Sequence, residues 1–370
     1  MKFTCEKNAL VGAISVASRT VAQKSTIPAL EGIYIRAGVK LTLSGYNLET
    51  GITISVDAEI QQTGACIMPS RLFFDIIRKL PGDTVSISVD EKFKVSIRGG
   101  ISSFSITAMS SEDYPELPEV ESDKGISLPQ NELKAMIGGT SFAVSENQAR
   151  PIHTGCLFEV EDSSITVVAV DGYRLALRRW KSEEPIGRTL KFVVPAAALK
   201  EAEKILGDTD EACTFFLGSK HILFTIGEAT LVCRLLEGEF LDWRRVLPQN
   251  QPVKLAVNVA KMTDSIERVG LIISEKLKSP VRCKFGENTA DFRSVSTIGE
   301  AHDVCQIAGD GQDMEIGFNC RYLLDALRAI PDAECSLELI NGLSPIVMNP
   351  CDGSERYSYM VLPVRLKAGE

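Results

Sequence analysis

The sequence predicts an α+β fold made of three tandem copies of one domain, and three observations support this prediction. First, the 370 residues are enough for two or three globular domains, each with its own core. Second, an extended apolar segment, a turn and an amphipathic helix recur three times, with the helices SRLFFDIIRKL, AAALKEAEKIL and CRYLLDALRAI. Third, each helix ends at a turn, and alternating strands follow each turn.

The first half of each copy repeats as well, so each domain reads β-α-β-β-β twice. Strands precede helices that begin near Glu6, Asn131 and Val259. Hairpin-like pairs then follow at GIYIRAGVKLTLSG, GCLFEVEDSSITVVAV and PVRCKFGENTADFRSV. We expect helices at residues 6–22, 70–79, 130–143, 195–206, 258–273 and 319–330, and domains at residues 1–120, 125–248 and 252–366.

Local signals indicate where the helices of the second half-units begin. Ser70 and Asn319 are expected N-caps, and Pro195 suits the first turn of its helix. Apolar residues at helical spacing predict one buried face for the first of these helices, made by Leu72, Phe73, Ile76, Ile77 and Leu80.

Composition excludes several classes of protein. No segment approaches the roughly 20 consecutive apolar residues of a membrane helix. The N-terminus MKFTCEKNAL has charges where a signal peptide has its apolar run, so we expect a cytoplasmic protein without a membrane partner. The ten Cys are scattered singly with no C-x-x-C pair, and the three His form no cluster, so we expect buried free thiols, no metal site and no cofactor.

Charge is distributed unevenly between the expected helices and the rest of the chain. The six helices carry twelve basic and eight acidic residues, a net +4, although the whole chain carries −9. The remainder therefore carries −13. If all six helices face one surface, that surface attracts duplex DNA and the rest repels it. The alternative is that these are ordinary solvated helix faces.

An enzyme is the first competing interpretation, and the sequence offers little for it. Asp171 and Asp113 could be read as catalytic carboxylates, but no acid/base pair, nucleophile elbow, phosphate-binding loop or metal cluster accompanies them. The pairs Gly99-Gly100 and Gly138-Gly139 lack the strand-to-helix context of a phosphate site. We therefore expect a scaffold with no catalytic site of its own.

Several short sequence segments are more specific than the repeat pattern. They are MKFT at the start, VDGYRLAL (170–177), EGEFLDWRRVLP (237–248), IGFNCRYLLDAL (316–327) and YMVLPVRL (359–366). In this order on a threefold repeat they resemble the beta subunit of bacterial DNA polymerase III, the beta sliding clamp. The resemblance spans the chain from Met1 to Leu366.

The resemblance implies a DNA clamp fold in which two chains join head to tail. Helices line the inside of the resulting ring and antiparallel sheets form the outside. Such a homodimer encircles duplex DNA without sequence specificity and tethers the replicative polymerase, which raises its effective concentration and makes it processive. The implied partners are the DNA polymerase III catalytic subunit, the clamp loader complex and other proteins with clamp-binding motifs. A monomeric peptide-binding adaptor without DNA encirclement is the alternative.

The resemblance also implies a pocket for short peptides with apolar anchors, between the second and third domains. Aliphatic residues would make its floor, and Tyr173, Arg174 and Arg245 would add polar edges that orient a peptide. His153 departs from the apolar residue more usual at its position, and the alternative for Leu175 or Leu366 alone is an ordinary core residue. The implied pocket residues are His153, Val170, Gly172, Tyr173, Arg174, Leu175, Leu241, Arg245, Val246, Tyr322, Leu343, Pro345, Val361, Leu362, Pro363, Val364, Arg365 and Leu366.

Two further surfaces follow from the resemblance and the helix charges. Ala196-Ala197 stands where relatives often carry basic residues, which predicts weaker DNA contact there. The expected dimer contact consists of Phe104 and Ile106 with Leu271 and Ile272, although either pair could be ordinary core. The expected DNA-facing residues are Lys24, Arg71, Arg78, Lys79, Lys134, Arg150, Lys200, Lys204, Lys261, Arg268, Arg321 and Arg328.

Overall fold

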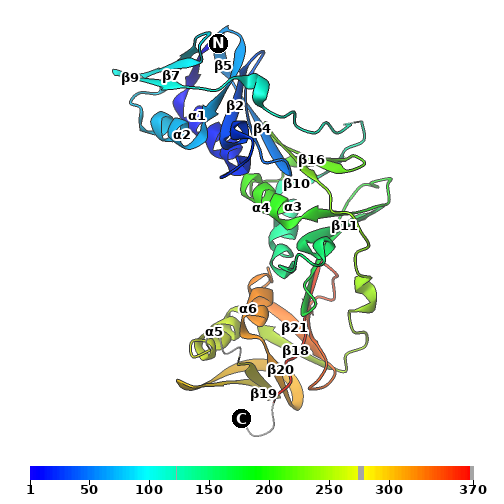
Figure 1. Ribbon diagram of the computed structural model, residues 1–370. Helices are drawn as coiled ribbons and strands as arrows, with labels where there is room; N and C mark the ends of the chain where they lie inside the picture. The colour runs from blue at the N-terminus through cyan, green and yellow to red at the C-terminus, as the bar shows by residue number, and fades with distance from the viewer. Residues whose placement is uncertain (122, 274–278, 367–370) are drawn as a thin grey trace. The chain divides into compact units, whose positions relative to one another are not determined.

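A computed structural model describes residues 1–121, 123–273 and 279–366. The chain divides into two compact units, each with its own sheets and helices (Figure 1). The first unit comprises Met1–Lys134 and Glu201–Leu235, and the second comprises Ala135–Lys200 and Leu236–Glu370. The boundary falls inside the predicted central domain, so the predicted limits 1–120, 125–248 and 252–366 stay a prediction.

Each of the six expected helices is present among the described residues, and most are shorter than expected because their last turns are irregular. Short 3₁₀ turns at Ser18–Thr20 and Ser141–Ala143 follow the first and third helices instead of continuing them. The helices are α1 (Lys7–Ala17), α2 (Ser70–Lys79), α3 (Gln130–Gly138), α4 (Ala196–Ile205), α5 (Val259–Gly270) and α6 (Cys320–Arg328).

One of the two N-cap predictions is confirmed and the other is wrong. The Asn319 side chain accepts a hydrogen bond from the Tyr322 backbone N–H at 3.3 Å. Ser70 is already inside α2, whose cap position is Pro69, and its hydroxyl lies 3.1 Å from that of Ser18. Pro195 likewise ends a strand directly before α4 instead of lying within its first turn. In both cases the proline closes the preceding strand, and the helix begins one residue later.

The first unit contains two antiparallel sheets. One has the strand order β5-β1-β7-β8-β9, and the other has the order β10-β15-β16-β17-β4-β3-β2-β6. Strand β9 is therefore an open edge. The strands are β1 (Lys2–Glu6), β2 (Gly32–Ala37), β3 (Leu41–Tyr46), β4 (Thr50–Val56), β5 (Ala58–Gln62), β6 (Gly64–Pro69), β7 (Thr84–Val89), β8 (Lys94–Gly99), β9 (Ser102–Thr107), β10 (Ile126–Pro129), β15 (Ala212–Leu217), β16 (His221–Ile226) and β17 (Ala229–Arg234).

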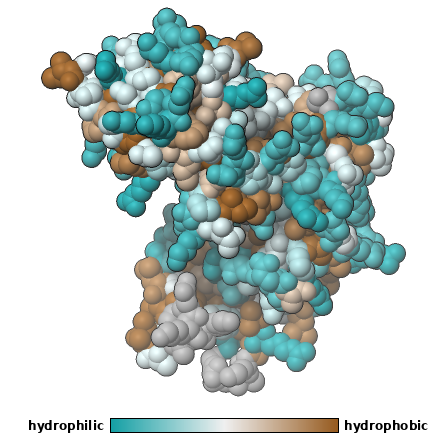
Figure 2. Space-filling view, turned by 45° about the horizontal axis from the view of Figure 1, so that its top comes forward, coloured by the Kyte–Doolittle hydropathy of each residue, from teal (hydrophilic) through white to brown (hydrophobic). Residues whose placement is uncertain are grey.

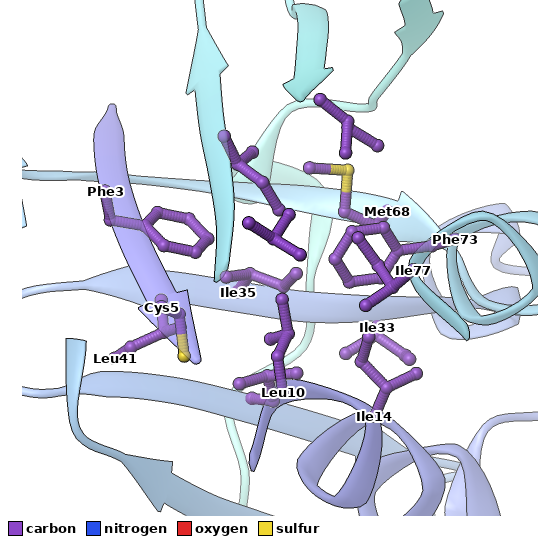
Figure 3. Packing of buried hydrophobic residues seen from close by; sticks show 14 of the residues in the cluster. Phe3, Cys5, Leu10, Ile14, Ile33, Ile35, Leu41, Met68, Phe73 and Ile77 are labelled. Atoms are coloured by element: carbon purple, nitrogen blue, oxygen red, sulfur yellow. The ribbon is translucent and has the colours of Figure 1, made fainter. Parts of the chain in front are cut away.

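The largest core of this unit is almost entirely aliphatic, as the low aromatic content predicts. Helix α1 packs against α2 and against β3 and β4. Leu10 and Ile14 of α1 meet Phe73 and Ile77 of α2 over the sheet (Figure 3). Leu72 is half exposed, so the prediction that it belongs to the buried face of α2 is wrong. It lies next to Phe73 on the helix, at the solvent border of that face.

The second unit contains one antiparallel sheet with the order β14-β11-β12-β13-β23-β22-β21-β18-β20-β19. Helix α5 packs on β19 and β20 and against α6. The strands are β11 (Gly155–Glu161), β12 (Ser164–Val170), β13 (Arg174–Lys181), β14 (Leu190–Pro195), β18 (Val253–Asn258), β19 (Val281–Ser296), β20 (Gly299–Phe318), β21 (Glu334–Leu339), β22 (Ile346–Pro350) and β23 (Tyr357–Val361).

The expected hairpin within PVRCKFGENTADFRSV agrees with the structure. Both of its arms lie in β19, where residues 281–285 pair with residues 314–318 of β20 and residues 289–296 pair with residues 299–306. The register shifts on both sides of Glu287, and Asn288 has a positive φ of 55°. The chain turns back at Gly286-Glu-Asn, where a Cβ at Gly286 would lie 3.6 Å from Thr289 Oγ1, and β20 has positive-φ residues at Gln312 and Asp313 where it follows this turn.

A turn before the last strand of each first half-unit is repeated in all three copies. The side chains of Asn47 and Asp171 accept hydrogen bonds from backbone N–H groups two and three residues later. The Ser296 hydroxyl accepts one from the N–H of Ile298. These turns lead into β4, β13 and β20, so the repeat extends to single hydrogen bonds.

Two strand pairings join neighbouring predicted domains, and both follow one rule. We call each such pairing a seam. In the first seam, Thr50–Ile54 of β4 pairs antiparallel with Ala229–Cys233 of β17. In the second, Arg174–Arg178 of β13 pairs with Tyr357–Val361 of β23. In each seam the strand that follows the repeated turn pairs with the last strand of the next domain.

The burial of most cysteines agrees with the expectation from composition. Eight of the ten Cys are buried free thiols, and burial raises the pKa of Cys156 to about 12. Among the described residues, no group of His, Cys, Asp and Glu could hold a metal ion. No helix in the described part of the chain is long and apolar enough to cross a membrane.

Candidate functional site

The predicted pocket residues all belong to the second unit, where the turn between β12 and β13 forms one side of the site. Asp171 organises this turn, since its carboxylate accepts the N–H groups of Tyr173 and Arg174 at 2.8 and 3.0 Å. Gly172 has a φ of +93°, a conformation that favours glycine. As a result the Tyr173 side chain stands 61% exposed beside the site.

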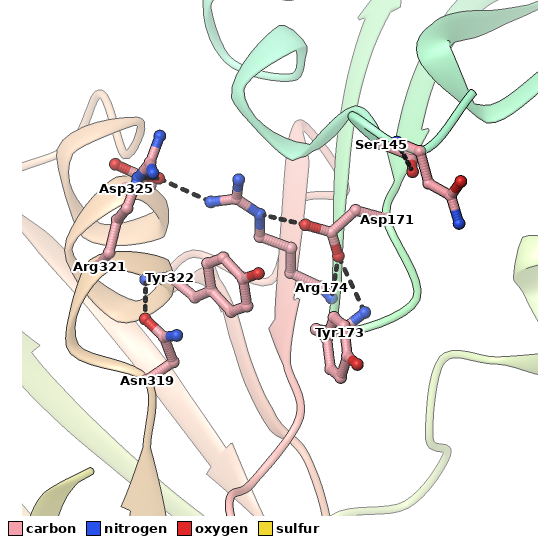
Figure 4. Close-up of polar contacts among 9 residues, drawn as sticks. Ser145, Asp171, Tyr173, Arg174, Asn319, Arg321, Tyr322 and Asp325 are labelled. Atoms are coloured by element: carbon pink, nitrogen blue, oxygen red, sulfur yellow. Dashed lines mark hydrogen bonds and ion pairs between the residues drawn. The ribbon is translucent and has the colours of Figure 1, made fainter. Parts of the chain in front are cut away.

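Arg174 is buried, and its guanidinium joins two parts of the unit (Figure 4). Its Nε donates to Asp171 Oδ2 at 2.9 Å, and its Nη1 donates to Asp325 Oδ2 of α6 at 2.6 Å. The guanidinium carbon also lies 4.4 Å from the ring centroid of Tyr322. The charge of Arg174 is therefore already paired within the unit, and its role as a polar edge for a peptide stays a prediction. Arg174 also holds Tyr322 in the wall.

An apolar cluster lies beneath this turn and makes a floor. Its buried members include the predicted Val170 and Leu175, and Val246 and Leu362 pack against it from partly buried positions. Phe240 and Trp243, which the resemblance did not name, complete the cluster. Val361 is also buried, directly opposite Arg174 in the second seam.

The C-terminal segment crosses the site beside the turn. The N–H of Leu362 donates to the Tyr173 carbonyl at 2.8 Å, and the N–H of Val364 donates to the Gly317 carbonyl at 2.7 Å. Leu366 lies so close to Gly317 that a Cβ at that glycine would meet its side chain at 2.5 Å. These bonds fix the segment as an irregular extra strand, with Arg365 exposed.

A cavity of about 830 Å³ opens between this segment, the Tyr173 turn and the facing ends of α5 and α6. Five of the predicted pocket residues line it. Tyr173 and Tyr322 stack with ring centroids 6.1 Å apart at its rim. The predicted lining residues are Tyr173, Tyr322, Leu362, Pro363 and Val364, and the unpredicted ones include Gly270, Asn319, Cys320, Arg321, Leu324 and Arg328.

The other predicted pocket residues lie around this floor and cavity. Leu241 and Leu343 are exposed, and Pro345 is partly buried. Arg245 is exposed and pairs with Asp242 at 3.0 Å. His153 packs its ring edge against Phe240 at 5.2 Å between centroids, and burial, with the charge of Arg150, lowers the pKa of His153.

The twelve predicted DNA-facing side chains divide into two groups. Six have no carboxylate partner within the described residues, and the other six are already paired with acidic side chains. Arg268, for example, pairs with Asp303, and Arg328 pairs with Glu267 at 2.6 Å. The unpaired group is Lys24, Arg71, Lys79, Arg150, Lys200 and Lys261, and the paired group is Arg78, Lys134, Lys204, Arg268, Arg321 and Arg328.

The predicted dimer residues lie at exposed positions in each unit. Phe104 and Ile106 are on the open edge strand β9, with Phe104 42% exposed and Ile106 partly buried against the core. Leu271 follows α5 and is 82% exposed, and Ile272 beside it is partly buried. On the face drawn in Figure 2, such hydrophobic residues are scattered among hydrophilic ones.

Three positions that matter to the site were missed by sequence reasoning. Phe240 and Trp243 belong to the quoted segment EGEFLDWRRVLP, and as aromatic residues in a chain with two Trp they could have been singled out. Asp325 had no such signal, because it sits three residues after Tyr322 on a helix whose acidic residues looked like solvated ones.

Comparison with known proteins covers the whole chain. Family models described as the N-terminal, central and C-terminal domains of the DNA polymerase III beta subunit match residues 1–118, 127–242 and 244–365. The beta sliding clamp of Staphylococcus epidermidis is 32% identical over 381 residues, which covers 99% of each chain.

Solved structures agree with these matches. The DNA polymerase sliding clamp from Bacillus subtilis is 30% identical with a TM-score of 0.94, and the match covers 99% of this chain and 100% of that one. A putative DNA polymerase III beta subunit from Eubacterium rectale is 32% identical with a TM-score of 0.93, covering 98% of this chain and 99% of that one.

Proposed function

This chain belongs to the family of DNA polymerase III beta subunits, the beta sliding clamps, and we propose that two copies of it close head to tail into a ring around duplex DNA. As a member of the family it is a processivity factor of DNA replication, a non-catalytic partner of the polymerase on DNA. The dimer, the ring and the peptide site below are the parts of the proposal that need testing.

The observation that carries the ring is the rule shared by the two seams. The strand after the repeated turn pairs with the last strand of the following domain, β4 with β17 and β13 with β23. Two strands of the same kinds remain without such a partner among the described residues, the start of β20 and the edge strand β9. A third seam between β20 of one copy and β9 of another completes the series.

The first seam also supplies a register for the third. By position after their hairpin turns, Gly299–Asp303 corresponds to Thr50–Ile54, and Ser102–Ile106 corresponds to Ala229–Cys233. Antiparallel pairing then sets Phe104 opposite Ala301 and Ile106 opposite Gly299. The small residues of β20 leave room for the two larger side chains of β9.

Encirclement explains how a chain of net charge −9 acts on DNA. Exposed basic residues without a carboxylate partner, such as Arg71 and Lys261, attract phosphates only weakly and in a salt-dependent way. A closed ring needs no tight contact, because topology keeps it on the DNA. A separate clamp loader must then open it, since a closed ring cannot thread itself onto a circle.

The floor and cavity of the second unit fit a short peptide with apolar anchors. Leu362 and Val364 offer an apolar wall, Tyr173 and Tyr322 form an aromatic rim, and exposed Leu241 and Leu343 extend the surface. We assign to this site the DNA polymerase III catalytic subunit, the clamp loader and other proteins with clamp-binding motifs. Linear motifs on all of them can share one site in turn.

Retention on DNA of different topology tests the ring. The protein is loaded with a bacterial clamp loader and ATP onto a nicked circular plasmid, and free protein is removed by gel filtration. The expected result is retention on the circle, loss after a restriction enzyme linearises it, and a solution mass about twice 40.3 kDa. Equal retention on linear and circular DNA, or a mass of one chain, would contradict the ring and favour the monomeric adaptor.

A further inference from the structure

The segment that leads into the C-terminal domain packs against the rest of the second unit. We call residues 240–247 the strap. A single 3₁₀ turn, Trp243–Arg245, interrupts it. Trp243 is 5% exposed, although Asp242, Arg244 and Arg245 around it are exposed. The strap therefore inserts two large aromatic side chains, Phe240 and Trp243, into the fold, and the residues directly beside Trp243 stay in solvent.

Three donors from two parts of the unit converge on one buried carboxylate, that of Glu159. The indole N–H of Trp243 donates to Glu159 Oε2 at 3.1 Å, and Arg244 Nη1 donates to the same oxygen at 2.7 Å. Lys191 Nζ lies 3.3 Å from Oε1. Glu159 is on β11, directly opposite Lys191 of β14, and is 7% exposed. Both oxygens of this buried carboxylate therefore have donors from the protein itself.

The Trp243 ring belongs to the floor of the peptide site. It is in one apolar cluster with Val170 and Leu175, and Val246 and Leu362 pack against that cluster. The Arg244 guanidinium covers the ring at 4.3 Å from its centroid. The position of the ring therefore determines where the strap residues on either side of it stand. These are Leu241, which extends the apolar surface of the peptide site, and Val246, which packs against its floor.

We propose that Glu159 is a positioning residue of the peptide site, which locks Trp243 and so sets the strap wall without touching the peptide. This inference rests on the proposed peptide-binding function. A buried carboxylate stripped of its donors is costly, so Glu159 and the strap stabilise each other. The site is then preorganised before a peptide arrives, which lowers the ordering cost of binding.

The test uses Trp243 itself as the reporter. The chain has two Trp, so a W180F background leaves Trp243 as the sole source of indole emission. In this background E159A removes all three interactions, and E159Q keeps an acceptor for the indole but loses the charge. The matched control is E161Q, two residues further along β11, whose exposed carboxylate receives only Arg244 Nη2 at 3.2 Å. The binding probe is a fluorescein-labelled synthetic peptide with leucine and phenylalanine anchors.

We expect E159A to shift Trp243 emission to the red, to increase its quenching by acrylamide, and to weaken peptide binding about tenfold or more. E159Q should show smaller changes in the same direction, and E161Q should match the W180F parent. Circular dichroism and solution mass confirm that each variant is folded.

Each contrary outcome has a separate meaning. Unchanged Trp243 emission in E159A would contradict the claim that Glu159 locks Trp243, whether or not the peptide binds. Shifted emission with unchanged peptide affinity overturns the positioning role and leaves the peptide site standing. If the W180F parent and the unmodified protein both fail to bind the probe, the proposed peptide site and the positioning role fall together.

Discussion

The two seams of this chain have the same backbone pairing and differ in a few side chains. Both pair five residues antiparallel at the same distance from the preceding turn. Both continue with one extra hydrogen bond at each end. In the first seam these run from Arg234 N–H to the Glu49 carbonyl and from Ser55 N–H to the Glu228 carbonyl, and in the second from Leu362 N–H to the Tyr173 carbonyl and from Arg179 N–H to the Arg356 carbonyl. Backbone geometry alone therefore does not distinguish a joint from a binding site.

The side chains at equivalent positions do distinguish them. Thr50 begins β4, but the equivalent Arg174 begins β13 and reaches Asp325 of α6. The turn before β4 has Leu48 at a φ of 74°, and the turn before β13 has Gly172 at 93°. The comparison teaches that the repeat supplies the same backbone scaffold to both seams. Different side chains at single positions make the second seam part of the candidate peptide site.

Breaking the proposed third seam should have the largest effect. In the two-residue hairpin of β8 and β9, alternation leaves the N–H of Ser105 pointing to the open edge. Ser105→Pro removes that donor and should reduce the solution mass from about twice 40.3 kDa to one chain. Multi-angle light scattering measures this.

Ser105→Ala is the matched control for this change, because it keeps the N–H at the same position. We expect it to remain a dimer. A Ser105→Pro variant that stays dimeric at low micromolar concentration would remove β9 from the seam.

Removing the charge that distinguishes the second seam should have the next largest effect. Arg174→Ala leaves the carboxylates of Asp171 and Asp325 without their shared partner, which costs about 3–5 kcal/mol of unfolding free energy for a buried pair. It also releases Tyr322, so peptide affinity should fall at least about tenfold.

Thr50→Ala makes the corresponding change in the first seam and should cost about 1 kcal/mol or less, with peptide affinity unchanged. Urea unfolding and fluorescence polarisation measure both variants. Equal losses at the two positions would mean that the seams do not differ as we describe.

Exchanging the turn residues should have smaller effects of opposite sign. Gly172→Ala puts a Cβ on a residue with positive φ and should cost about 1–2 kcal/mol. Leu48→Gly relieves the same strain in the first seam and should gain up to about 1 kcal/mol. Thermal unfolding of both variants checks the signs, and a stabilising Gly172→Ala would contradict this account.

Histidine titration should have the smallest effect. Burial lowers the pKa of His153 in the second unit and of His221 in the first below their ordinary 6.5. The unfolded chain then takes up these protons at a higher pH than the folded chain does. Stability is therefore present above the ordinary pKa and is lost as the pH falls through it.

His153→Leu and His221→Leu should each reduce the loss of Tm between about pH 7.5 and 5.5. Differential scanning calorimetry at the two pH values measures this loss. An unchanged loss in both variants would show that neither histidine contributes.

Periodicity and turn residues predicted the repeat because both are local properties of the chain. The α2 limits were right at both ends, since Pro69 before the helix and Pro81 after it bound the segment. The turn at Gly286-Glu-Asn was recognisable from its residues as well. The pairing of both arms of this hairpin with β20 was not predictable in this way, because it depends on residues further along the chain.

The site residues likewise divide into those that the sequence predicted and those that depend on distant parts of the chain. The resemblance brought together Tyr173, Leu362 and Val364, which do line one cavity. It could not show that Arg174 is already paired, because Asp325 lies 151 residues away and only the fold brings them together. Buried charge pairs depend on three-dimensional proximity, which no spacing along the chain records.

The common register of the seams has a consequence for curvature. In the proposed ring, two chains of three domains would place six joints in a closed circuit, so each joint would turn the path by about 60°. A slip of one residue in any one joint would move a strand by about 3.3 Å and reverse its faces. Such displacements would add from joint to joint, and the strands of the last joint would then no longer lie close enough to pair. A ring whose joints all turn by the same angle requires the same strand register at every joint. The two seams share one register, and the proposed third seam would close the ring with that register as well.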